Sequence, residues 1–276
     1  SFSDPNFFVS RFNKPKRKKE ILITIDDGFK SFYTEAWPYL RKNKIPFILF
    51  ISTEPVGKNG YMDWNEIKEI EKMDFAMIGH HSHTHEYLID MNNSDFVKDI
   101  EIATKIFKEK LGYVPEIFSY PFGEYSQYMK EYISKNFKIA FGQHSGVIDI
   151  NKDKFELPRF PINEKYGDLE RFKFLVNLLP FQYKKVEPEE KIIDNNNPPK
   201  MIVEFFQNQN IKNMNCFSNE GDGWDKSKLI IKNNILTVNF RDKFKNRRGR
   251  INCSINDNDG WRWFGVQFVQ KNIKEN

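Results

Sequence analysis

Long apolar runs, cysteines and a recognisable leader are scarce or absent in this sequence, and each absence narrows what the protein can be. No stretch approaches the roughly 20 apolar residues that span a bilayer, so we expect no transmembrane segment. Only two cysteines occur, Cys216 and Cys253, and they are too few to establish a redox compartment. They pair if the protein is exported, or they are two small buried apolar side chains.

The chain starts at Ser1 and shows no secretory signal. Because the first residue is not Met, we expect a processed or truncated protein whose signal could have been removed with the missing start. In that case the protein is exported to the periplasm, the cell surface or the medium. The sequence carries no information on the oligomeric state.

Composition favours a folded globular protein. Hydrophobic residues make up 39% and aromatic residues 16% of 276 residues, enough for one large domain or a domain plus a small one. The net charge of +5 is carried partly by basic clusters at 14–19 and 241–250. Such clusters can bind nucleic acid. No fold signature of nucleic-acid binding accompanies them, so we interpret both as solvated surface and expect no nucleic-acid partner.

Strand-like and helix-like patterns alternate up to about residue 180. This alternation favours a largely parallel sheet with helices packed outside it, an α/β fold. Periodicity does not decide between an open sheet and a barrel. We expect strands at 20–25, 47–51, 75–79, 115–120, 137–141 and 155–160, and helices at 31–44, 64–73, 94–111 and 126–136.

The composition changes near residue 184, where a segment rich in proline and asparagine predicts a linker over 184–200. We therefore expect a first domain over 1–183 and a second over 201–276. The second should be a small antiparallel β-sandwich and is a candidate glycan-binding domain. Its expected strands are 201–206, 229–232, 235–240, 250–255 and 261–270.

Two adjacent carboxylates, Asp26 and Asp27, end the first apolar run and are followed at once by Gly28. Glycine permits a turn that other residues resist. Successive side chains of an extended backbone point in opposite directions. One carboxylate can therefore bind a metal while the other handles a proton, although an ordinary Asp-Gly turn is the alternative.

Four of the five histidines lie at positions 80, 81, 83 and 85. His81 and His85 are four residues apart, so a helical turn would place both imidazoles on one side, where they can hold one cation. Two histidines and one aspartate leave a coordination position open. That arrangement is typical of catalytic rather than structural zinc.

These two stretches resemble the first two motifs of the polysaccharide deacetylases of carbohydrate esterase family 4, the NodB homology domain. They read Thr-Ile-Asp-Asp-Gly at 24–28 and His-Ser-His-Thr-His at 81–85, within a resemblance that covers about 20–165. The resemblance implies a distorted (β/α) barrel. It also implies Asp26 as the catalytic base, and Asp27, His81 and His85 as ligands of a divalent metal, zinc first and nickel or cobalt as alternatives.

The later motifs depart from the family pattern. Ser-Tyr-Pro-Phe-Gly at 119–123 stands where much of the family has Arg-x-Pro-Tyr-Gly. The resemblance implies substrate contacts in this stretch, and the backbone N–H of Phe122 can hold an oxyanion without help from a side chain. Arg159 either replaces the missing arginine by pairing with Asp26 or forms a surface salt bridge. The implied substrate-binding residues are Tyr120, Pro121, Phe122 and Gly123.

This variant pattern is similar to the poly-β-1,6-N-acetylglucosamine deacetylases of biofilm exopolysaccharide systems. In that branch the histidine that acts as an acid precedes the Asp-Asp pair, and no histidine precedes Asp26 here. His144 is therefore our candidate acid. The alternatives are that the acid was lost with the missing start, that turnover is slow without one, and that His144 is a plain loop residue.

Aromatic residues near the motifs suit a sugar, whose apolar faces stack on flat rings, but each can equally belong to the core. The candidates are Tyr61, Trp64, Tyr120, Phe122 and Tyr125 near the site, and Trp224, Trp261 and Trp263 in the tail. For the tail we favour core packing.

The resemblance thus implies a metal-dependent hydrolase that removes N-acetyl groups from an N-acetylglucosamine-containing polysaccharide, its expected partner. An O-acetyl esterase of the acetylxylan type is a second possibility, because the same site hydrolyses esters. A third is a degenerate glycan-binding protein, against which the intact Asp-Asp and His-x-x-x-His pairs argue.

Overall fold

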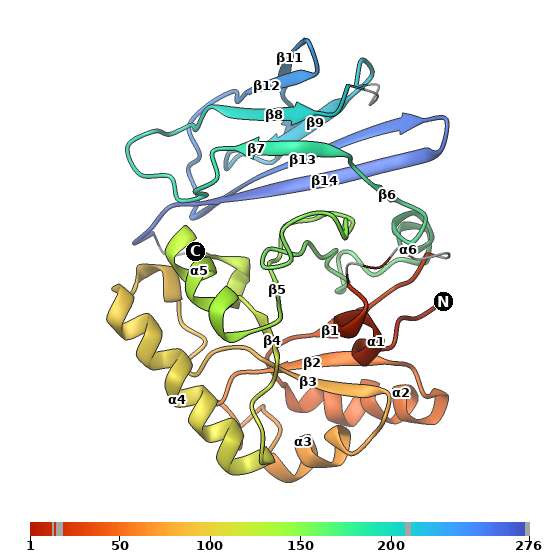
Figure 1. Cartoon of the computed structure of the whole chain (residues 1–276), viewed down its shortest axis with the longest axis vertical. Coiled ribbons are helices and arrows are strands. Elements are labelled where there is room, and N and C mark those ends of the chain that lie inside the picture. Colours follow the sequence, from red (N-terminus) through yellow and green to blue (C-terminus); the bar gives the residue numbers. More distant parts are fainter. Residues whose placement is uncertain (13, 15–18, 208–210, 274–276) are drawn as a thin grey trace. The chain divides into compact units, whose positions relative to one another are not determined.

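The computed structural model describes residues 1–12, 14, 19–207 and 211–273, so residues 15–18 of the first basic cluster lie outside the described part. The chain forms two compact units, and both are drawn in Figure 1. The first comprises Ser1–Gly123, Tyr128–Phe141 and Asp153–Glu156, and the remaining residues form the second. No helix among the described residues is long and apolar enough to cross a membrane.

The first unit is built on one parallel sheet whose five strands follow each other in chain order. This half-barrel fits the (β/α) barrel expected of a deacetylase domain. Residues 20–25 give a shorter strand than expected, whereas 47–51 gives the expected one. The strands are β1 (Ile23–Ile25), β2 (Phe47–Ile51), β3 (Ala76–His80), β4 (Ile117–Ser119) and β5 (Ile139–Phe141).

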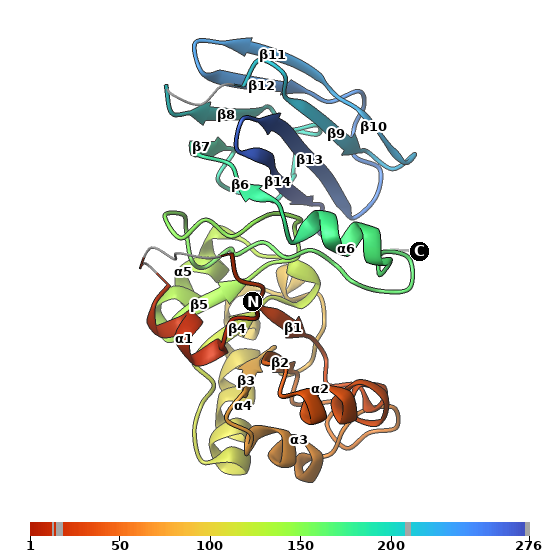
Figure 2. The same ribbon diagram turned by 90° about the vertical axis from the view of Figure 1, so that its right-hand side faces the viewer.

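Helices cover both faces of this sheet (Figure 2). Phe47, Leu49 and Ile51 of β2 share a core with apolar residues of α2, α3 and α4. The intervening Phe50 contacts Phe141, which also contacts Phe8 of α1 on the opposite face. The helical elements are α1 (Pro5–Ser10), the π-turn η1 (Phe32–Ala36), α2 (Trp37–Asn43), α3 (Trp64–Glu71), η2 (Leu88–Asp90), α4 (Asn93–Leu111), η3 (Pro121–Gly123) and α5 (Gln127–Asn136).

Two details of the first half differ from expectation. The helix α4 begins at Asn93, one residue before the expected start, and Asn92 is its N-cap because the Asn92 side chain accepts the hydrogen bond of Asp95 N–H. The strand expected at 155–160 is absent from the described structure. Pro158 and Pro161 remove two of the donors that a ladder needs, and this segment runs as a loop instead.

The second unit contains two sheets that share one hydrophobic core. Their strand orders are β10-β9-β13-β14-β6 and β11-β12-β8-β7, and all neighbours are antiparallel except β14 and β6. The elements are α6 (Leu169–Leu175), β6 (Leu179–Pro180), β7 (Tyr183–Glu187), β8 (Met201–Phe205), β9 (Asn215–Asn219), β10 (Trp224–Lys226), β11 (Lys228–Lys232), β12 (Ile235–Asn239), β13 (Arg248–Asp257) and β14 (Gly260–Val269).

Cys216 of β9 lies opposite Cys253 of β13 in register, and the two form a disulfide. Of the two alternatives for the cysteines, the structure therefore shows pairing. Residues 184–187, which fall in the expected linker, belong to β7. The division into a functional domain over 1–183 and a second over 201–276 stays a prediction.

Candidate active site

Three side chains of the first unit converge on one point after the carboxyl ends of β1 and β3. Asp27 Oδ1 lies 2.9 Å from His85 Nε2 and 3.3 Å from His81 Nε2. One ligand atom of each residue falls within 4.8 Å of the other two. Zinc bonds of about 2.0–2.2 Å place neighbouring ligand atoms of a tetrahedron roughly 3.3 Å apart, so the spacing suits a single cation.

Asp27 reaches this point through a left-handed backbone. Its φ is 75° and that of Gly28 is 76°, so the expected strand-like alternation of Asp26 and Asp27 is wrong. Gly28 N–H donates to Asp26 O, and Gly28 O accepts from Met62 N–H, both at 3.0 Å. A Cβ on Gly28 would lie 2.8 Å from Ile51 Cδ1, so that methyl group would have to shift, and the positive φ by itself makes glycine the favoured residue of this turn.

The histidines are held by an irregular loop, and the expected helical turn is wrong. Ser82 and His85 have positive φ, 70° and 57°, which no helix contains. Main-chain and side-chain hydrogen bonds tie the loop to the end of β2: Ser52 Oγ donates to His81 O at 2.6 Å, and Glu54 N–H donates to His83 O at 3.0 Å.

A buried carboxylate that sequence reasoning missed anchors the same loop. Asp99 of α4 is 4% exposed and accepts from His83 N–H at 2.8 Å and from Thr84 N–H at 3.0 Å. Thr84 Oγ1 also donates to it at 2.7 Å. The only signal in the sequence was an aspartate on the apolar side of a helix, beside Ile100 and Ala103.

The hydrogen bonds of His81 show that a cation fits between these residues. Its Nδ1 lies 2.6 Å from Ser119 O, and because a carbonyl only accepts, Nδ1 carries the proton. In the neutral ring, Nε2 then presents a lone pair toward the Asp27 carboxylate. Both Asp27 Oδ1 and His81 Nε2 are buried atoms for which the described residues provide no hydrogen-bond partner. A divalent cation would satisfy both.

Electrostatics keep Asp27 ionised. Burial by itself would raise the pKa of Asp27, but the imidazoles of His81 and His85, 3.3 and 2.9 Å away, outweigh it and hold the pKa well below its usual range. An ionised carboxylate is the form that binds a metal.

The other two histidines of the cluster have structural surroundings. His80 of β3 is fully buried among Phe107, Phe118 and Phe137, and burial lowers its pKa to about 3, so it is neutral. His83 Nδ1 lies 2.8 Å from Thr53 Oγ1. Neither belongs to the Asp27–His81–His85 group.

The expected substrate-binding stretch follows β4 as the short turn η3, which contains Pro121 and Gly123. Phe122 has φ 58°, and its ring lies 4.8 Å from His85 and 4.5 Å from Tyr87, centroid to centroid. Tyr120 is fully buried. A surface role for the Tyr120 ring is therefore wrong, because burial leaves it no face for a sugar.

Asp26 directly follows β1, is partly exposed and precedes Asp27 in the chain. His144 and Arg159 belong to the second unit. There they lie together: Arg159 N–H donates to His144 O at 3.0 Å, and Arg159 Nε donates to Gly142 O at 2.8 Å. Their expected roles at Asp26, as acid and as orienting group, stay predictions.

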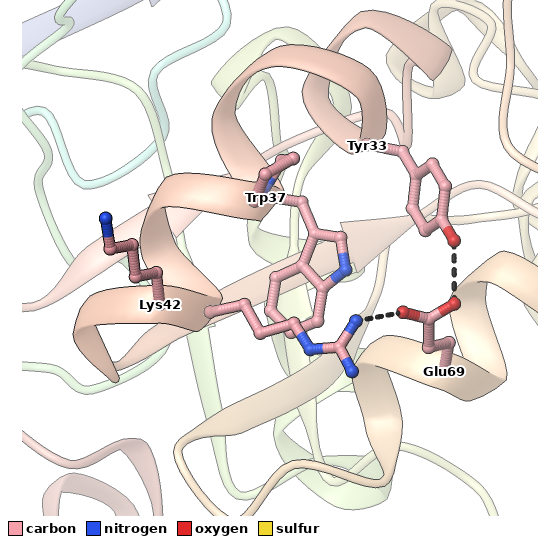
Figure 3. Close-up of a pocket in the computed structure, with 6 residues that line it drawn as sticks. Tyr33, Trp37, Lys42 and Glu69 are labelled. Carbon is pink, nitrogen blue, oxygen red and sulfur yellow. Dashed lines mark hydrogen bonds and ion pairs between the residues drawn. The ribbon is translucent and has the colours of Figure 1, made fainter.

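A surface pocket of the first unit lies on different elements from this site. Its lining residues come from η1, α2 and α3 (Figure 3). Glu69 accepts hydrogen bonds there from Tyr33 Oη at 2.7 Å and Arg41 Nη1 at 2.8 Å, so its carboxylate is already engaged. The hydrogen bond to Glu69 raises the pKa of Tyr33 to about 12. We assign this pocket no chemistry.

Comparison with known proteins finds a family match within the first half of the chain. Residues 13–138 match the polysaccharide deacetylase family. The chain is 24% identical over 161 residues to the poly-β-1,6-N-acetyl-D-glucosamine N-deacetylase of Staphylococcus aureus, and this match covers 53% of the chain. The chain thus spans only 56% of that relative's length.

Solved structures share the fold at low identity. IcaB from Ammonifex degensii aligns over 60% of this chain and 78% of its own, with a TM-score of 0.54 and 24% identity. A de-N-acetylase from Aggregatibacter actinomycetemcomitans aligns over 63% and 82%, with a TM-score of 0.56 and 12% identity. At these identities the likeness concerns the fold alone.

Proposed function

We propose that this protein is a metal-dependent hydrolase that removes N-acetyl groups from an N-acetylglucosamine-containing polysaccharide, since residues 13–138 match the polysaccharide deacetylase family. The observation that carries the proposal is the convergence of Asp27, His81 and His85, with two buried ligand atoms left unsatisfied. The substrate class is supported by the S. aureus relative, whose name states a β-1,6-linked N-acetylglucosamine polymer.

Asp27, His81 and His85 would hold the divalent metal, with zinc as the first candidate and nickel or cobalt as alternatives. When bound, the metal lowers the pKa of a water molecule and polarises the acetyl carbonyl. Ser119 O keeps His81 in the tautomer whose Nε2 is free to coordinate.

The remaining steps belong to side chains and backbone of the protein. Asp26 accepts the proton of the attacking water as general base. The N–H of Phe122 donates to the acetyl oxygen as negative charge grows on it. His144 is proposed to return a proton to the sugar nitrogen as the C–N bond breaks, and Arg159 to keep Asp26 ionised.

We further propose that the two sheets of the second unit form a β-sandwich domain and that the protein works outside the cytoplasm. The Cys216–Cys253 disulfide supports export, because disulfides persist in oxidising compartments.

Acetate release tests the function. The protein, loaded with zinc, nickel or cobalt in turn, is incubated with β-1,6-linked N-acetylglucosamine oligomers, chitooligomers and acetylxylan. We expect acetate from the N-acetylated oligomers and none after chelation. Acetate from acetylxylan alone would replace the proposal by an O-acetyl esterase, and polymer binding without acetate would replace it by a glycan-binding protein.

Two variants separate the base from the ligand. Asp26→Asn should abolish acetate release and keep the zinc content of the wild type, whereas Asp27→Ala should lose both. An Asp26→Asn protein with a normal rate would contradict the assignment of the base.

A further inference from the structure

An aromatic pair, exposed Phe29 and partly buried Tyr61, lies close in the chain to the candidate active site. Phe29 directly follows the Asp26-Asp27-Gly28 turn, and 43% of its surface is exposed. Its ring stacks on Tyr61 with a centroid distance of 5.0 Å and an interplanar angle of 27°. Two Cα–Cα steps of 3.8 Å place the Cα of Phe29 at most about 7.6 Å from that of Asp27.

The backbone fixes this pair to the metal-binding segments. Phe29 and Tyr61 form an isolated antiparallel bridge, in which Lys30 N–H donates to Gly60 O at 2.8 Å and Met62 N–H to Gly28 O at 3.0 Å. The loop that carries Tyr61 is therefore tied to the residue that follows Asp27. The same loop begins beside the histidines, where Glu54 N–H donates to His83 O at 3.0 Å.

Residues 54–62 thus connect the two segments that supply the ligands. Within this loop, Gly57 N–H donates to Met62 O at 2.9 Å and Tyr61 N–H to Lys58 O at 3.1 Å, which closes the loop on itself. Gly57 and Gly60 adopt φ values of 82° and 86°, a conformation that glycine adopts without strain. Tyr61 is consequently presented by an ordered turn, with its ring backing that of Phe29.

The main-chain hydrogen bonds described above hold the large apolar ring of Phe29 on the surface of the protein. Its exposure to water therefore calls for a functional explanation. Phe29 has no covering side chain other than Tyr61 among the ring contacts of the described residues. Exposed apolar surface beside a polar site is typical of a ligand-binding groove. A pyranose has an apolar face and a polar edge, so it can stack on a ring while its substituents reach a neighbouring polar centre.

We propose that Phe29, backed by Tyr61, is a sugar-stacking subsite that seats a hexosamine unit of the polymer next to the unit being deacetylated. The inference rests on the proposed function. It assigns to this pair a preference for sugar chains over small acetyl compounds, since a substrate without a pyranose ring has nothing to place on Phe29.

The test is the ratio of kcat/KM for a β-1,6-linked N-acetylglucosamine oligomer to kcat/KM for ethyl acetate, an ester that has no ring to stack on Phe29. Phe29→Ala should lower this ratio about three- to tenfold, the effect of losing one stacking contact, with most of the change in KM for the oligomer. Phe29→Tyr, which keeps the ring, should restore it. Tyr39→Ala is the matched control, because Tyr39 is 64% exposed on α2 and belongs to no site described above.

Zinc content and thermal melting are measured on every variant. A folding defect would lower the rates with both substrates, whereas loss of the subsite would lower the rate with the oligomer. A ratio in Phe29→Ala equal to that of the wild type and of Tyr39→Ala would overturn the subsite. A wild-type protein that hydrolyses the ester but no N-acetylated oligomer would overturn the proposed function itself, and the subsite with it.

Discussion

Asp99 allows a quantitative test of how the histidine loop is held. Its buried carboxylate accepts three hydrogen bonds from His83 and Thr84, between the two histidines that converge on Asp27. Asp99→Ala would leave two backbone N–H groups without their acceptor. The loop would then lose the contact that fixes its irregular backbone, while every ligand side chain stayed in the sequence.

The magnitude follows from the chemistry of these contacts. Hydrogen bonds to a charged acceptor are worth about 1.5–3 kcal/mol each, and an orphaned buried N–H costs about 1–3 kcal/mol. Not all of this reaches the metal, because the loop can relax toward water. Removal of a group that orients the ligands typically costs 10–100-fold in metal affinity, or about 1.4–2.8 kcal/mol. We expect Asp99→Ala to fall in that range.

The assay is competition between the protein and a chromogenic chelator for zinc near neutral pH. Asp99→Asn, which keeps the shape and one acceptor oxygen, should lose less affinity than Asp99→Ala. Glu101→Gln is the control, since Glu101 is exposed on the same helix. If Asp99→Ala, still folded by circular dichroism, bound zinc within about twofold of the wild type, the loop would not depend on this carboxylate.

Three further predictions concern stability. Arg247, fully buried with bidentate bonds to the buried Glu124, should be costly to remove, and Arg247→Met should lower the free energy of unfolding by about 3–5 kcal/mol in chemical denaturation. Cys216→Ser should cost about 2–5 kcal/mol, and reductant should reproduce the loss in the wild type only. Burial alone would lower the pKa of Lys130, but carboxylates 2.9 Å from its Nζ raise it above 10.5. The ion pairs of Lys130 should therefore contribute their full stabilisation of the folded state below pH 10.5 and lose it as the pH rises past the elevated pKa. The melting temperature of the wild type should fall over this range, and that of Lys130→Met should lack this fall.

Much of the first unit could be predicted because its local signals agree. The run 47–51 is apolar throughout and is buried on both faces, and Gly112 ends α4 in the left-handed conformation that favours glycine. Candidate residues followed the ends of predicted strands, and parallel strands bring their carboxyl ends to one edge. The residue pattern was therefore enough to group His81 and His85 with one aspartate of the Asp26-Asp27 pair, and the family resemblance pointed to Asp27.

The second unit was harder because tertiary contacts define it. Residues 124–127 follow the η3 turn, yet they belong to the second unit, where Glu124 is bound by Arg247 from a distant part of the chain. No local sequence pattern predicts an ion pair between residues that are 123 positions apart. The strand expected at 155–160 failed for a similar reason, since its apolar residues belong to a loop whose proline-interrupted backbone makes only isolated main-chain hydrogen bonds, at Leu157 and Arg159.

The backbone of the site explains why its geometry, unlike its composition, escaped prediction. Asp27, Ser82, His85 and Phe122 all have positive φ without being glycine. Such conformations cost about 1–3 kcal/mol each and persist only where surrounding contacts impose them. For the histidine loop those contacts come from β2, Asp99 and Ser119, all of which lie outside the loop in sequence. Residue patterns report local preference, and at this site the fold overrides local preference and brings three side chains together.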